Sequence, residues 1–583
     1  MKVSVYGAGA NAEILLRKLA DCGTYPQLLC DSDSNKQGTQ VCGYIVQSPE
    51  VLRMGCDLFI IVSVFSEDAY NEIKQLLIEK GFEEGKDFVR YSVFFGGELT
   101  PLDVLWGQKS GYKLAVSDMA GNEYISHKGY DTMRLYSGNG KIVRVANGKP
   151  AQLYRDVLTK LLTGGGEILG KYIVGTKISE QLKGDFVVEH EYIKPIIYAC
   201  EFSPLMFYDY TKFIIDLMEK IDSVGLFLCD MGTFNGTFNK GNFILIDFPA
   251  VIDGKMGCLS FSYFLMLYVN ILHLFAKGHF DKAYLYMRNI RVHCTFGDIK
   301  GLLSLNEISE YESMSEICLD QLRKGDISKC CEHMRNYVDK IPLKQVATPW
   351  LGYQKKLYAS RLAESDWTNK QKTVINWIKS ENIKTMIDLA GNEGFFSLVL
   401  SDSLDYAISA DLDHACVDDL YKSIMEKKIK NVIPAYINIV TATPPFFRGE
   451  NCGDSPIRPF LLGTRERFKC DCVLALAVLH HLVMQQCLDF VEIINLLSSY
   501  TTRYMIVEFI DRTDSTLYNI SSDFDWYSRE NFETELAKQS FSILDVKLSS
   551  PETRLLYFLD KQSNEQQTKK EEINNENRSV WCR

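Results

Sequence analysis

Residues 387–397 read IDLAGNEGFFS, and this stretch decides the fold of the C-terminal part of the chain. An apolar run closes with Asp388, a short loop of small residues follows, and apolar residues then take helical spacing. Glycine and asparagine adopt the unusual backbone angles of a tight turn more readily than most residues. The stretch therefore predicts a strand, a loop and a helix, with the loop at the carboxyl end of the strand.

The same unit recurs along the chain. Strand patterns alternate with helix patterns in residues 405–429, 431–440, 470–500 and 503–514. Strands that alternate with helices form a doubly wound, mostly parallel sheet, whose ligand site lies at the carboxyl ends of the strands. The predicted fold class is therefore an α/β multidomain chain whose C-terminal domain is doubly wound and Rossmann-like.

Four positions around these strand ends are candidates for holding a ligand. Asp388 closes the first strand, and Gly394 follows it where the backbone would pass close beneath a bound molecule. Asp411 ends the second strand, at the distance where an acid meets the ribose hydroxyls of a nucleoside. Asn438 ends the third strand, where its side chain could meet an adenine amino group.

Three further polar residues lie at the mouth of this predicted site. The segment LALAVLHHL brings His480 and His481 to the end of the fourth strand, and Glu508 lies in the strand after it. A histidine with a pKa near neutrality can remove the proton of a hydroxyl group. The alternative is that the histidine pair caps a helix and points one ring at the site, and that Glu508 is a polar strand end.

Five stretches together resemble the class I S-adenosylmethionine (SAM)-dependent methyltransferases of a bacterial group related to a nodulation methyltransferase. These stretches are PWLGYQ, DWTNKQ, DLAGNEGFFS, LALAVLHHL and VEFIDRTDS. The resemblance implies SAM as the cofactor and methyl transfer as the reaction. It implies a SAM site at Asp388, Gly394 and Asp411, and a methyl-transfer mouth at His480, His481 and Glu508.

The loop departs from the glycine-rich pattern of such methyltransferases. Ala390 stands where the first glycine usually lies, Gly391 is shifted by one position, and Asn392 occupies the middle glycine position. Alanine is small and asparagine tolerates a left-handed backbone, so the turn survives if Gly394 keeps the close approach. We therefore expect a working variant of the SAM loop, with its affinity more affected than its identity.

The first hundred residues form a separate α/β unit. Residues 2–23 give a strand, a glycine turn at Gly7 and Gly9, and an amphipathic helix, and Asp31 ends the next strand. The stretch resembles the small Rossmann modules that bind nucleotide-sugars and are attached to enzymes of bacterial polysaccharide assembly. It predicts a nucleotide or nucleotide-sugar at Gly7, Gly9 and Asp31; the alternative is a Rossmann-like fold without a nucleotide.

The middle of the chain carries a kinase-like spacing. Residues 225–248 hold Asp230, then Asn235, and then a strand pattern that ends at Asp247. In protein kinases a catalytic-loop aspartate receives the hydroxyl proton, and a following asparagine and aspartate bind magnesium. The spacing predicts a kinase-like α+β region that could bind ATP and magnesium, with the metal at Asn235 and Asp247 if the kinase is active.

Other kinase motifs are absent from the sequence. No GxGxxGxV loop precedes Asp230, and no histidine stands two residues before it. Lys141, Arg144 and Lys149 are candidate phosphate partners, and the spacing does not choose among them. The region resembles the kinase-like region before the methyltransferase domain in the same bacterial group. The alternative is a kinase-like scaffold that has lost phosphotransfer.

Composition narrows the classes of partner and compartment. The 583 residues carry a net charge of −11, which argues against a general nucleic-acid binder. The 17 cysteines are scattered without a CxxC pair, as free thiols of a reducing cytoplasm would be, and Cys330, Cys331 and His333 lack the second ligand pair of a zinc site. The start of the chain carries no signal-peptide pattern, so we expect a cytoplasmic protein. The apolar run at residues 258–275 predicts a buried helix rather than a stable membrane span.

These patterns divide the chain into residues 1–100, 101–345, 346–560 and a disordered tail, 561–583. A long insertion before the fourth strand carries Arg458, Arg465 and Arg467, which could clasp an anionic substrate or be solvated. The expected function is SAM-dependent methylation of a sugar or phosphosugar in surface polysaccharide or glycoconjugate synthesis. The alternatives are a bifunctional kinase and methyltransferase that acts on a glycan end, and a non-catalytic nucleotide-binding scaffold. The sequence predicts no oligomeric state.

Overall fold

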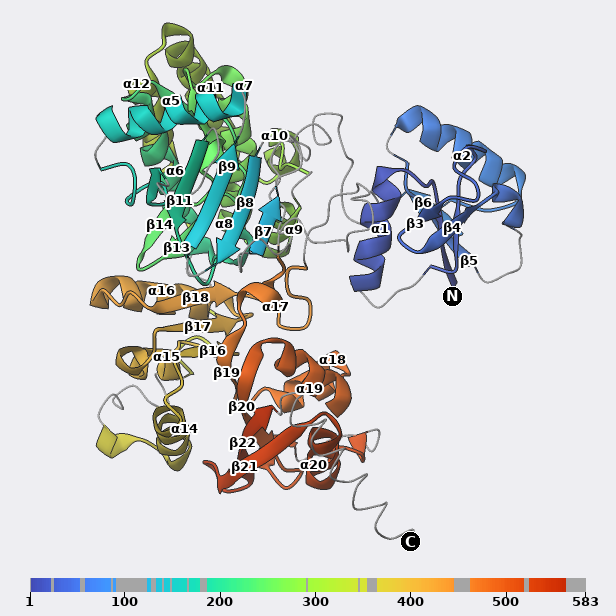
Figure 1. Ribbon diagram of the computed structural model, residues 1–583, viewed down its shortest axis with the longest axis vertical. Helices are drawn as coiled ribbons and strands as arrows, with labels where there is room; N and C mark the ends of the chain where they lie inside the picture. Colours follow the sequence, from blue (N-terminus) through green and yellow to red (C-terminus); the bar gives the residue numbers. More distant parts are fainter. Residues whose placement is uncertain are drawn as a thin grey trace.

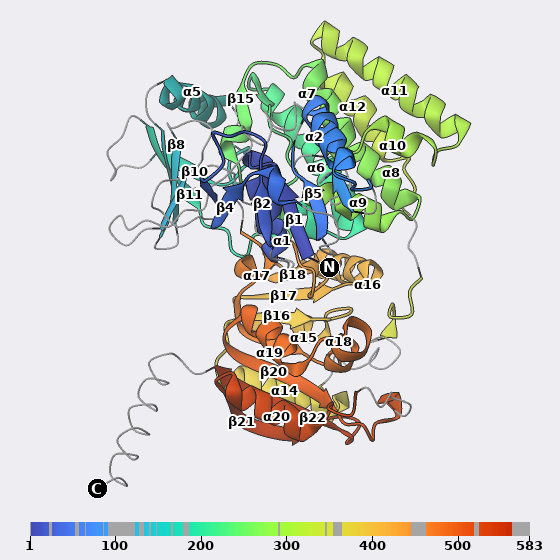
Figure 2. The same cartoon turned by 90° about the vertical axis from the view of Figure 1, so that its right-hand side faces the viewer.

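The structure is a computed structural model, and it places the described residues in three regions (Figure 1). The N-terminal region stands to one side, and the middle and C-terminal regions are stacked on each other (Figures 1 and 2). The predicted tail lies outside the described residues, apart from Lys561. The described residues are 2–21, 26–52, 58–64, 66–84, 87–90, 123–126, 133–138, 141–146, 149–164, 167–178, 186–289, 292–343, 347–353, 364–444, 462–517 and 524–561.

The N-terminal region is a six-stranded sheet with strand order β3-β4-β2-β1-β5-β6. Strand β1 lies between β2 and β5 and is parallel to both, as the predicted Rossmann-like unit requires. Its two apolar cores contain residues of this region alone. The elements are β1 (Lys2–Tyr6), α1 (Ala10–Asp21), β2 (Leu28–Cys30), β3 (Gln40–Val41), β4 (Tyr44–Gln47), β5 (Leu58–Val62), α2 (Glu67–Glu79) and β6 (Phe88–Arg90).

The middle region begins with a five-stranded antiparallel sheet of order β10-β11-β9-β8-β7. Helix α5 follows β9, and two short hairpin-like pairings, β12 with β15 and β13 with β14, come after the long helix α6. The elements are β7 (Glu123–Ser126), β8 (Met133–Gly138), β9 (Lys141–Ala146), α5 (Lys149–Gly164), β10 (Thr176–Ile178), β11 (Phe186–Glu191), α6 (Pro204–Asp222), β12 (Leu226–Leu228), β13 (Gly236–Asn239), β14 (Asn242–Leu245) and β15 (Val251–Asp253).

Helices complete the middle region. In the described part of the chain one helix, Cys258–Ala276, is long and apolar enough to cross a membrane by length and composition, and 61% of its apolar window is buried inside the molecule. It consists of α7 (Cys258–Phe264), a π-helical turn (Leu265–Val269) and α8 (Asn270–Ala276). The remaining helices are α9 (Phe280–Arg288), α10 (Phe296–Lys300), α11 (Leu305–Lys324) and α12 (Ile327–Val338).

The C-terminal region contains a seven-stranded sheet of order β18-β17-β16-β19-β20-β22-β21. The first five strands in this order are parallel, and β22 is antiparallel to both β20 and β21. The elements are α14 (Asn369–Ser380), β16 (Thr385–Leu389), α15 (Phe395–Val399), β17 (Tyr406–Asp411), α16 (His414–Lys427), β18 (Val432–Tyr436), α17 (Thr464–Arg467), β19 (Cys470–Ala475), α18 (Leu479–Gln486), α19 (Phe490–Ser499), β20 (Thr501–Ile510), α20 (Arg529–Lys538), β21 (Phe541–Leu548) and β22 (Arg554–Lys561).

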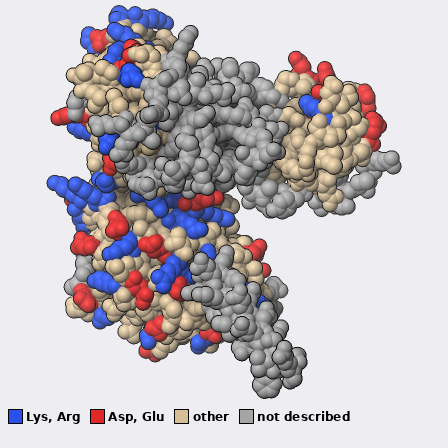
Figure 3. All heavy atoms as spheres, in the orientation of Figure 1, with Lys and Arg blue, Asp and Glu red and all other residues tan. Residues whose placement is uncertain are grey.

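Both faces of this sheet are buried, because neighbouring strand residues enter different cores. Met386 and Ala407 pack on the face covered by α14, whereas Ile387 and Ile408 pack on the opposite face with α16 and α19. The core on the face of α16 and α19 also contains residues of the middle region, so the middle and C-terminal regions share one apolar core. Along their border Figure 3 shows Lys and Arg side chains over α16, where Lys427 and Lys428 are exposed.

Candidate active site

The loop after β16 adopts the tight turn that the sequence predicts. Ala390 has φ +60°, Asn392 has φ +51° and Gly394 has φ +78°, so three of its residues are left-handed. The amide of Gly391 donates to the Ala410 carbonyl at 3.0 Å. A Cβ atom at Gly391 would lie 2.5 Å from Ser409 Oγ, so the loop can approach β17 only with glycine there.

Asp411 lies at the end of β17 and holds the loop in place. Its carboxylate accepts hydrogen bonds from the Asn392 amide at 2.7 Å and from the Asp413 amide at 2.8 Å. Burial raises the pKa of Asp411 to about 6, although these backbone hydrogen bonds oppose the increase. Asp411 is partly exposed and the next residue, Leu412, is 52% exposed, so this end of β17 reaches the surface.

Asp388 lies below the same loop and is almost completely buried. Burial raises its pKa to about 7; nearby Lys370 opposes the increase and Asp411 adds to it. Two carboxyl groups with raised pKa values therefore flank one small loop, which is a common property of ligand-binding and catalytic sites.

Glu508 is fully buried in β20, and both its carboxylate oxygens are engaged. Lys370 at the start of α14 donates to Glu508 Oε2 at 2.5 Å, and the Ser549 hydroxyl donates to Oε1. Sequence reasoning missed Lys370 and Ser549 because they lie far from Glu508 in the chain. Glu508 thus joins α14 and the segment before β22 to the centre of the site, and its assignment as a base stays a prediction.

The two predicted histidines lie together in the first turn of α18. Their ring centroids are 4.0 Å apart. Burial lowers the pKa of His480 to about 4, with His481 and Arg554 as further causes, so His480 is neutral near pH 7. Burial also lowers the pKa of His481, whose Nδ1 lies 3.1 Å from Gln485 Nε2. Both rings are therefore neutral near pH 7, as a base must be before it takes a proton, but a pKa of about 4 makes His480 a weak base.

An aromatic segment before α14 lies across the loop. The Asn392 side-chain amide donates to the Trp350 carbonyl at 3.1 Å, and the Gly352 amide donates to Glu393 Oε1 at 3.0 Å. The Trp350 ring meets the His481 ring edge-on, with centroids 5.8 Å apart. The segment thus forms a wall between the loop and the histidines.

Asn438 differs from its prediction in position. Strand β18 ends at Tyr436, so Asn438 lies beyond the strand and not at its end. Its side-chain oxygen accepts hydrogen bonds from the amides of Val440 at 3.0 Å and Thr441 at 3.2 Å. The residue shapes the turn after β18, because asparagine readily hydrogen-bonds to its own following backbone. Contact with adenine stays a prediction.

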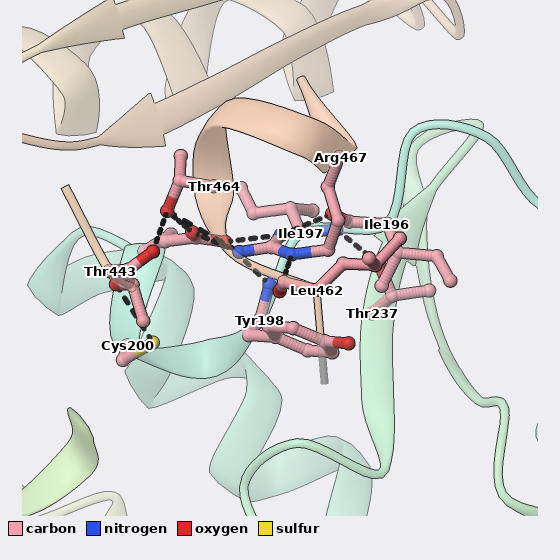
Figure 4. A network of polar contacts seen from close by, with 10 residues as sticks. Ile196, Ile197, Tyr198, Cys200, Thr237, Thr443, Leu462, Thr464 and Arg467 are labelled. Carbon is pink, nitrogen blue, oxygen red and sulfur yellow. Dashed lines mark hydrogen bonds and ion pairs between the residues drawn. The ribbon is translucent and has the colours of Figure 1, made fainter. Parts of the chain in front are cut away.

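The prediction that arginines of the insertion clasp a substrate is wrong for Arg467. Arg467 is buried and forms an ion pair with Glu201 of the middle region, and its guanidinium lies 4.1 Å from the Tyr198 ring centroid. Figure 4 shows Arg467 extending from α17 toward Tyr198. Arg465 donates to the Val440 carbonyl at 3.0 Å, and Arg458 lies outside the described residues.

The three kinase-like residues come together in the middle region. Asp230 accepts a hydrogen bond from the Gly232 amide at 2.9 Å, and the Asn235 side-chain amide donates to the Asp230 carbonyl at 3.3 Å. Asp247 follows the β13–β14 hairpin and forms a buried ion pair with Arg144 of β9 at 3.2 Å. The structure thus brings Arg144, one of three candidate cations, to the predicted metal-binding acid; of the side chains of Lys141 and Lys149 it describes nothing.

Burial dominates the protonation of this cluster. It raises the pKa of Asp230 to about 6 and raises that of Asp247 well above its usual range. Burial also lowers the pKa of Arg144 to about 9. Among the described residues no group of three or more His, Cys, Asp or Glu side chains is placed to hold a metal ion. Cys330 and Cys331 are buried thiols of α12.

The predicted nucleotide residues of the N-terminal region surround one turn. Gly7 has φ +103°, and a Cβ atom there would lie 2.8 Å from Ser63 Oγ. Asp31 accepts hydrogen bonds from the amides of Ala8 at 2.7 Å and Asp33 at 2.9 Å. Burial opposes ionisation of Asp31, but these hydrogen bonds and Lys36 outweigh burial and lower its pKa. No atom of the described residues lies within 4 Å of a Cβ built at Gly9, so among these residues that side of the turn is open.

The C-terminal region has the sheet order of class I SAM-dependent methyltransferases, with five parallel strands and the last strand in sequence inserted antiparallel beside the fifth. The loop lies at the carboxyl ends of the strands with one acid beneath it and one at its edge. Fold and site together form a doubly wound, Rossmann-like domain with a ligand loop at the carboxyl ends of its strands.

The chain is also similar to a particular curated protein. It is 26% identical over 217 residues to the nodulation protein NoeA of Rhizobium meliloti (strain 1021), which covers 36% of this chain and 43% of NoeA. The chain thus spans less than half the length of that relative. No family model matches the chain.

Solved structures give a weaker likeness. The SAH-bound magnesium protoporphyrin IX methyltransferase of Synechocystis PCC 6803 is 13% identical, with a TM-score of 0.26, over 38% of this chain and 90% of that one. A SAM-dependent methyltransferase of Aquifex aeolicus is 12% identical, with a TM-score of 0.26, over 37% and 100%. WbdD, described as a bifunctional kinase-methyltransferase, is 12% identical, with a TM-score of 0.25, over 36% and 42%. At these scores the likenesses carry no argument about activity.

Proposed function

We propose that the C-terminal region transfers a methyl group from SAM to a sugar or phosphosugar of a surface polysaccharide or glycoconjugate. The observation that carries the proposal is the loop at residues 390–394, which lies at the carboxyl edge of the sheet between two acids, Asp388 and Asp411. The edge is open at Leu412, and the loop itself is too tightly packed on β17 to be a solvent turn.

The residues present fit SAM. Asp411 is partly exposed beside the loop, where it could accept hydrogen bonds from ribose hydroxyls, and the left-handed loop would bring backbone close to a ligand. Asp388 and Asp411 supply negative charge toward a cation. SAM supplies a methyl group already activated on a sulfonium. The protein then has to orient an acceptor and remove its proton.

The walls of the site support a sugar hydroxyl as the acceptor. Trp350 and Tyr353 are 46% and 43% exposed, and such rings offer flat apolar surface with polar tips. His481 lies against the Trp350 ring and is neutral, so it can take the hydroxyl proton, with His480 beside it. Arg554 next to His480 favours an acceptor that carries a phosphate, although Asp514 already holds it at 2.9 Å.

The test is calorimetric titration of the full chain with SAM. We expect saturable binding by the wild type and at least tenfold weaker binding by Asp411→Asn, because hydrogen bonds to a charged group contribute about 1.5–3 kcal/mol. Asp413→Ser is the matched control, since serine keeps the N-cap of α16 that Asp413 provides. A wild type that binds no SAM rules the proposal out.

A second candidate is phosphorylation by the middle region before methylation. The observation that favours it is the convergence of Asp230, Asn235 and Asp247, with Arg144 beside Asp247. If the site is active, Asn235 and Asp247 hold magnesium and Asp230 orients the hydroxyl. Titration with magnesium ATP decides: binding that is lost in Asp247→Asn supports the kinase, and turnover of a glycan end is then measured.

The third candidate is a non-catalytic nucleotide-binding scaffold. It predicts binding of SAM or ATP without methyl transfer or phosphate release on any glycan offered. For the N-terminal region we propose a nucleotide or nucleotide-sugar as the ligand, supported by the open side of the turn at Gly9 and by Asp31 beneath it. Loss of that binding in Asp31→Ala tests this assignment.

A further inference from the structure

The edge strand of the C-terminal sheet, next to the proposed cofactor site, is covered by the middle region. Strand β18 is the edge strand of the seven-stranded sheet, and it lies next to β17, which ends at Asp411. In Figures 1 and 2 the middle region lies directly above β18 and α16. An edge strand pairs with another strand on one side only, so the side chains that cover its other side decide how firmly it is held.

The first contact is a ring stack at the end of β18. Tyr284 of α9 lies on Tyr436 with ring centroids 4.0 Å apart and an angle of 14° between the planes. Tyr436 is the register partner of Asp411, and the Ile437 amide donates to the Asp411 carbonyl at 3.0 Å. The Tyr284 hydroxyl is fixed by the Phe202 carbonyl at 2.9 Å. The stack thus restrains the strand end that carries the predicted ribose acid.

The second contact is at the start of α16. Phe280, the first residue of α9, stacks on His414 with ring centroids 3.9 Å apart. His414 is the first residue of α16, and Asp413 before it donates its amide to Asp411. The first two turns of α9 therefore contact two segments next to Asp411, the start of α16 through Phe280 and the end of β18 through Tyr284.

The third contact holds the turn after β18. Thr464 joins the buried pair of Glu201 and Arg467, because its hydroxyl donates to the Glu201 carboxylate. The Thr464 amide donates to the Thr443 carbonyl at 2.9 Å, which ties this pair to the segment before the insertion. The Cys200 thiol lies 3.7 Å from Thr443 Oγ1. Figure 4 shows these side chains meeting between the two regions.

We propose that the middle region completes the SAM site, and that Phe280 and Tyr284 are positioning residues for cofactor binding. The inference rests on the proposed methyltransferase function. Neither ring touches the loop; they act through His414 and Tyr436 on Asp411, which in turn holds the Asn392 amide. When the segments around Asp411 are already ordered, SAM binding does not bear the free-energy cost of ordering them, so its affinity is higher.

The test uses full-length variants and calorimetric titration with SAM. Phe280→Leu and Tyr284→Leu remove a ring while keeping an apolar side chain. We expect each to raise the SAM dissociation constant at least tenfold, and to raise KM for SAM with little change in kcat. Tyr284→Phe keeps the ring and should bind SAM like the wild type.

Asp209→Asn is the matched interface control. Asp209 accepts a hydrogen bond from Tyr421 at 2.8 Å, on the same helix as His414 but two turns farther along. The Asp209→Asn variant weakens the contact between the middle and C-terminal regions at a place away from Asp411. We expect its SAM affinity to stay within twofold of the wild type, even where its melting temperature falls as far as that of the leucine variants.

A second measurement needs no variant. In the wild type, SAM should slow amide hydrogen exchange both in residues 436–443 and in α9. Unchanged SAM affinity in both leucine variants, or an α9 that SAM does not protect, overturns the inference while wild-type binding leaves the methyltransferase standing. A wild type that binds no SAM overturns both.

Discussion

Asp388 and Asp411 bring two titrating carboxyl groups to one loop. Burial raises the pKa of Asp388 to about 7 and that of Asp411 to about 6. A protonated carboxyl is neutral and attracts a cationic ligand less than a carboxylate does. The protonation of these two residues therefore bears directly on how a sulfonium cofactor binds.

We predict that SAM affinity depends on pH through Asp388. A bound cation lowers the pKa of a nearby carboxyl, so binding releases a proton and affinity falls as the pH drops below about 7. Calorimetry in two buffers of different ionisation enthalpy, from pH 5.5 to 8, measures the proton release. In Asp388→Asn the dependence above pH 6.5 should disappear. Equal pH profiles for the wild type and the variant would contradict the assignment.

The sequence could predict those site residues whose position follows from the local strand and helix pattern. Asp411 ends β17 and Asp388 lies one residue before the end of β16, and the periodicity of the sequence marks both positions to within one residue. Lys370 reaches Glu508 from 138 residues away, and Arg467 reaches Glu201 from 266 residues away. Such pairs leave no periodic pattern in a single sequence, so Arg467 was predicted either to clasp a substrate or to be solvated, and it does neither.

At the scale of elements, the loop between β16 and α15 carries strain where glycine is missing. Ala390 has a left-handed backbone at φ +60°, which costs a residue with a Cβ about 1–2 kcal/mol. Gly394 also has a left-handed backbone, and a Cβ there would lie 2.7 Å from the Leu420 side chain. The two positions therefore respond oppositely to an exchange of alanine and glycine.

We predict that Ala390→Gly stabilises the protein by up to about 1 kcal/mol, because relief of strain exceeds the added entropy of the unfolded chain. Gly394→Ala should destabilise it by at least about 1 kcal/mol and weaken SAM binding. Chemical denaturation measures both changes. A loss of stability in Ala390→Gly would mean that the left-handed assignment of the loop is wrong.

Element types followed from the sequence more closely than element ends. The alternation of strands and helices predicted the doubly wound sheet, because the period of apolar residues fixes which faces are buried. Strand β18 ends at Tyr436, before the predicted Asn438, since Asn438 uses its side chain to form a turn. The antiparallel sheet of β7 to β11 was not predicted, because its short strands lack the βα rhythm.

At the scale of the whole molecule, the apolar cores of the described residues fall into two groups that share no residue. The cores of residues 2–90 include no residue of the other regions, whereas one core runs from Ala151 to Leu559 through both the middle and C-terminal regions. Segments that share a core unfold together, and segments that do not can unfold separately.

We predict two unfolding transitions in calorimetry. Ile61→Ala removes a buried side chain of β5 and should lower the free energy of unfolding of the N-terminal region alone, by about 2–5 kcal/mol. SAM at about 100 times its dissociation constant should raise the free energy of unfolding of the other two regions alone, by about 2.7 kcal/mol. A single transition that responds to both would show that the N-terminal region depends on the rest for its stability.

The ring stacks of α9 on His414 and Tyr436 also predict which residues a related protein without the middle region can carry at these two positions. Without α9, Tyr436 and the ring of His414 would face water as part of an apolar patch, which favours aggregation. Methyltransferases of this fold that exist as single domains should therefore carry small or polar residues at these two positions. An aromatic residue at the end of β18 together with one at the start of α16 would then identify, from sequence alone, the chains in which a middle region packs on the C-terminal sheet.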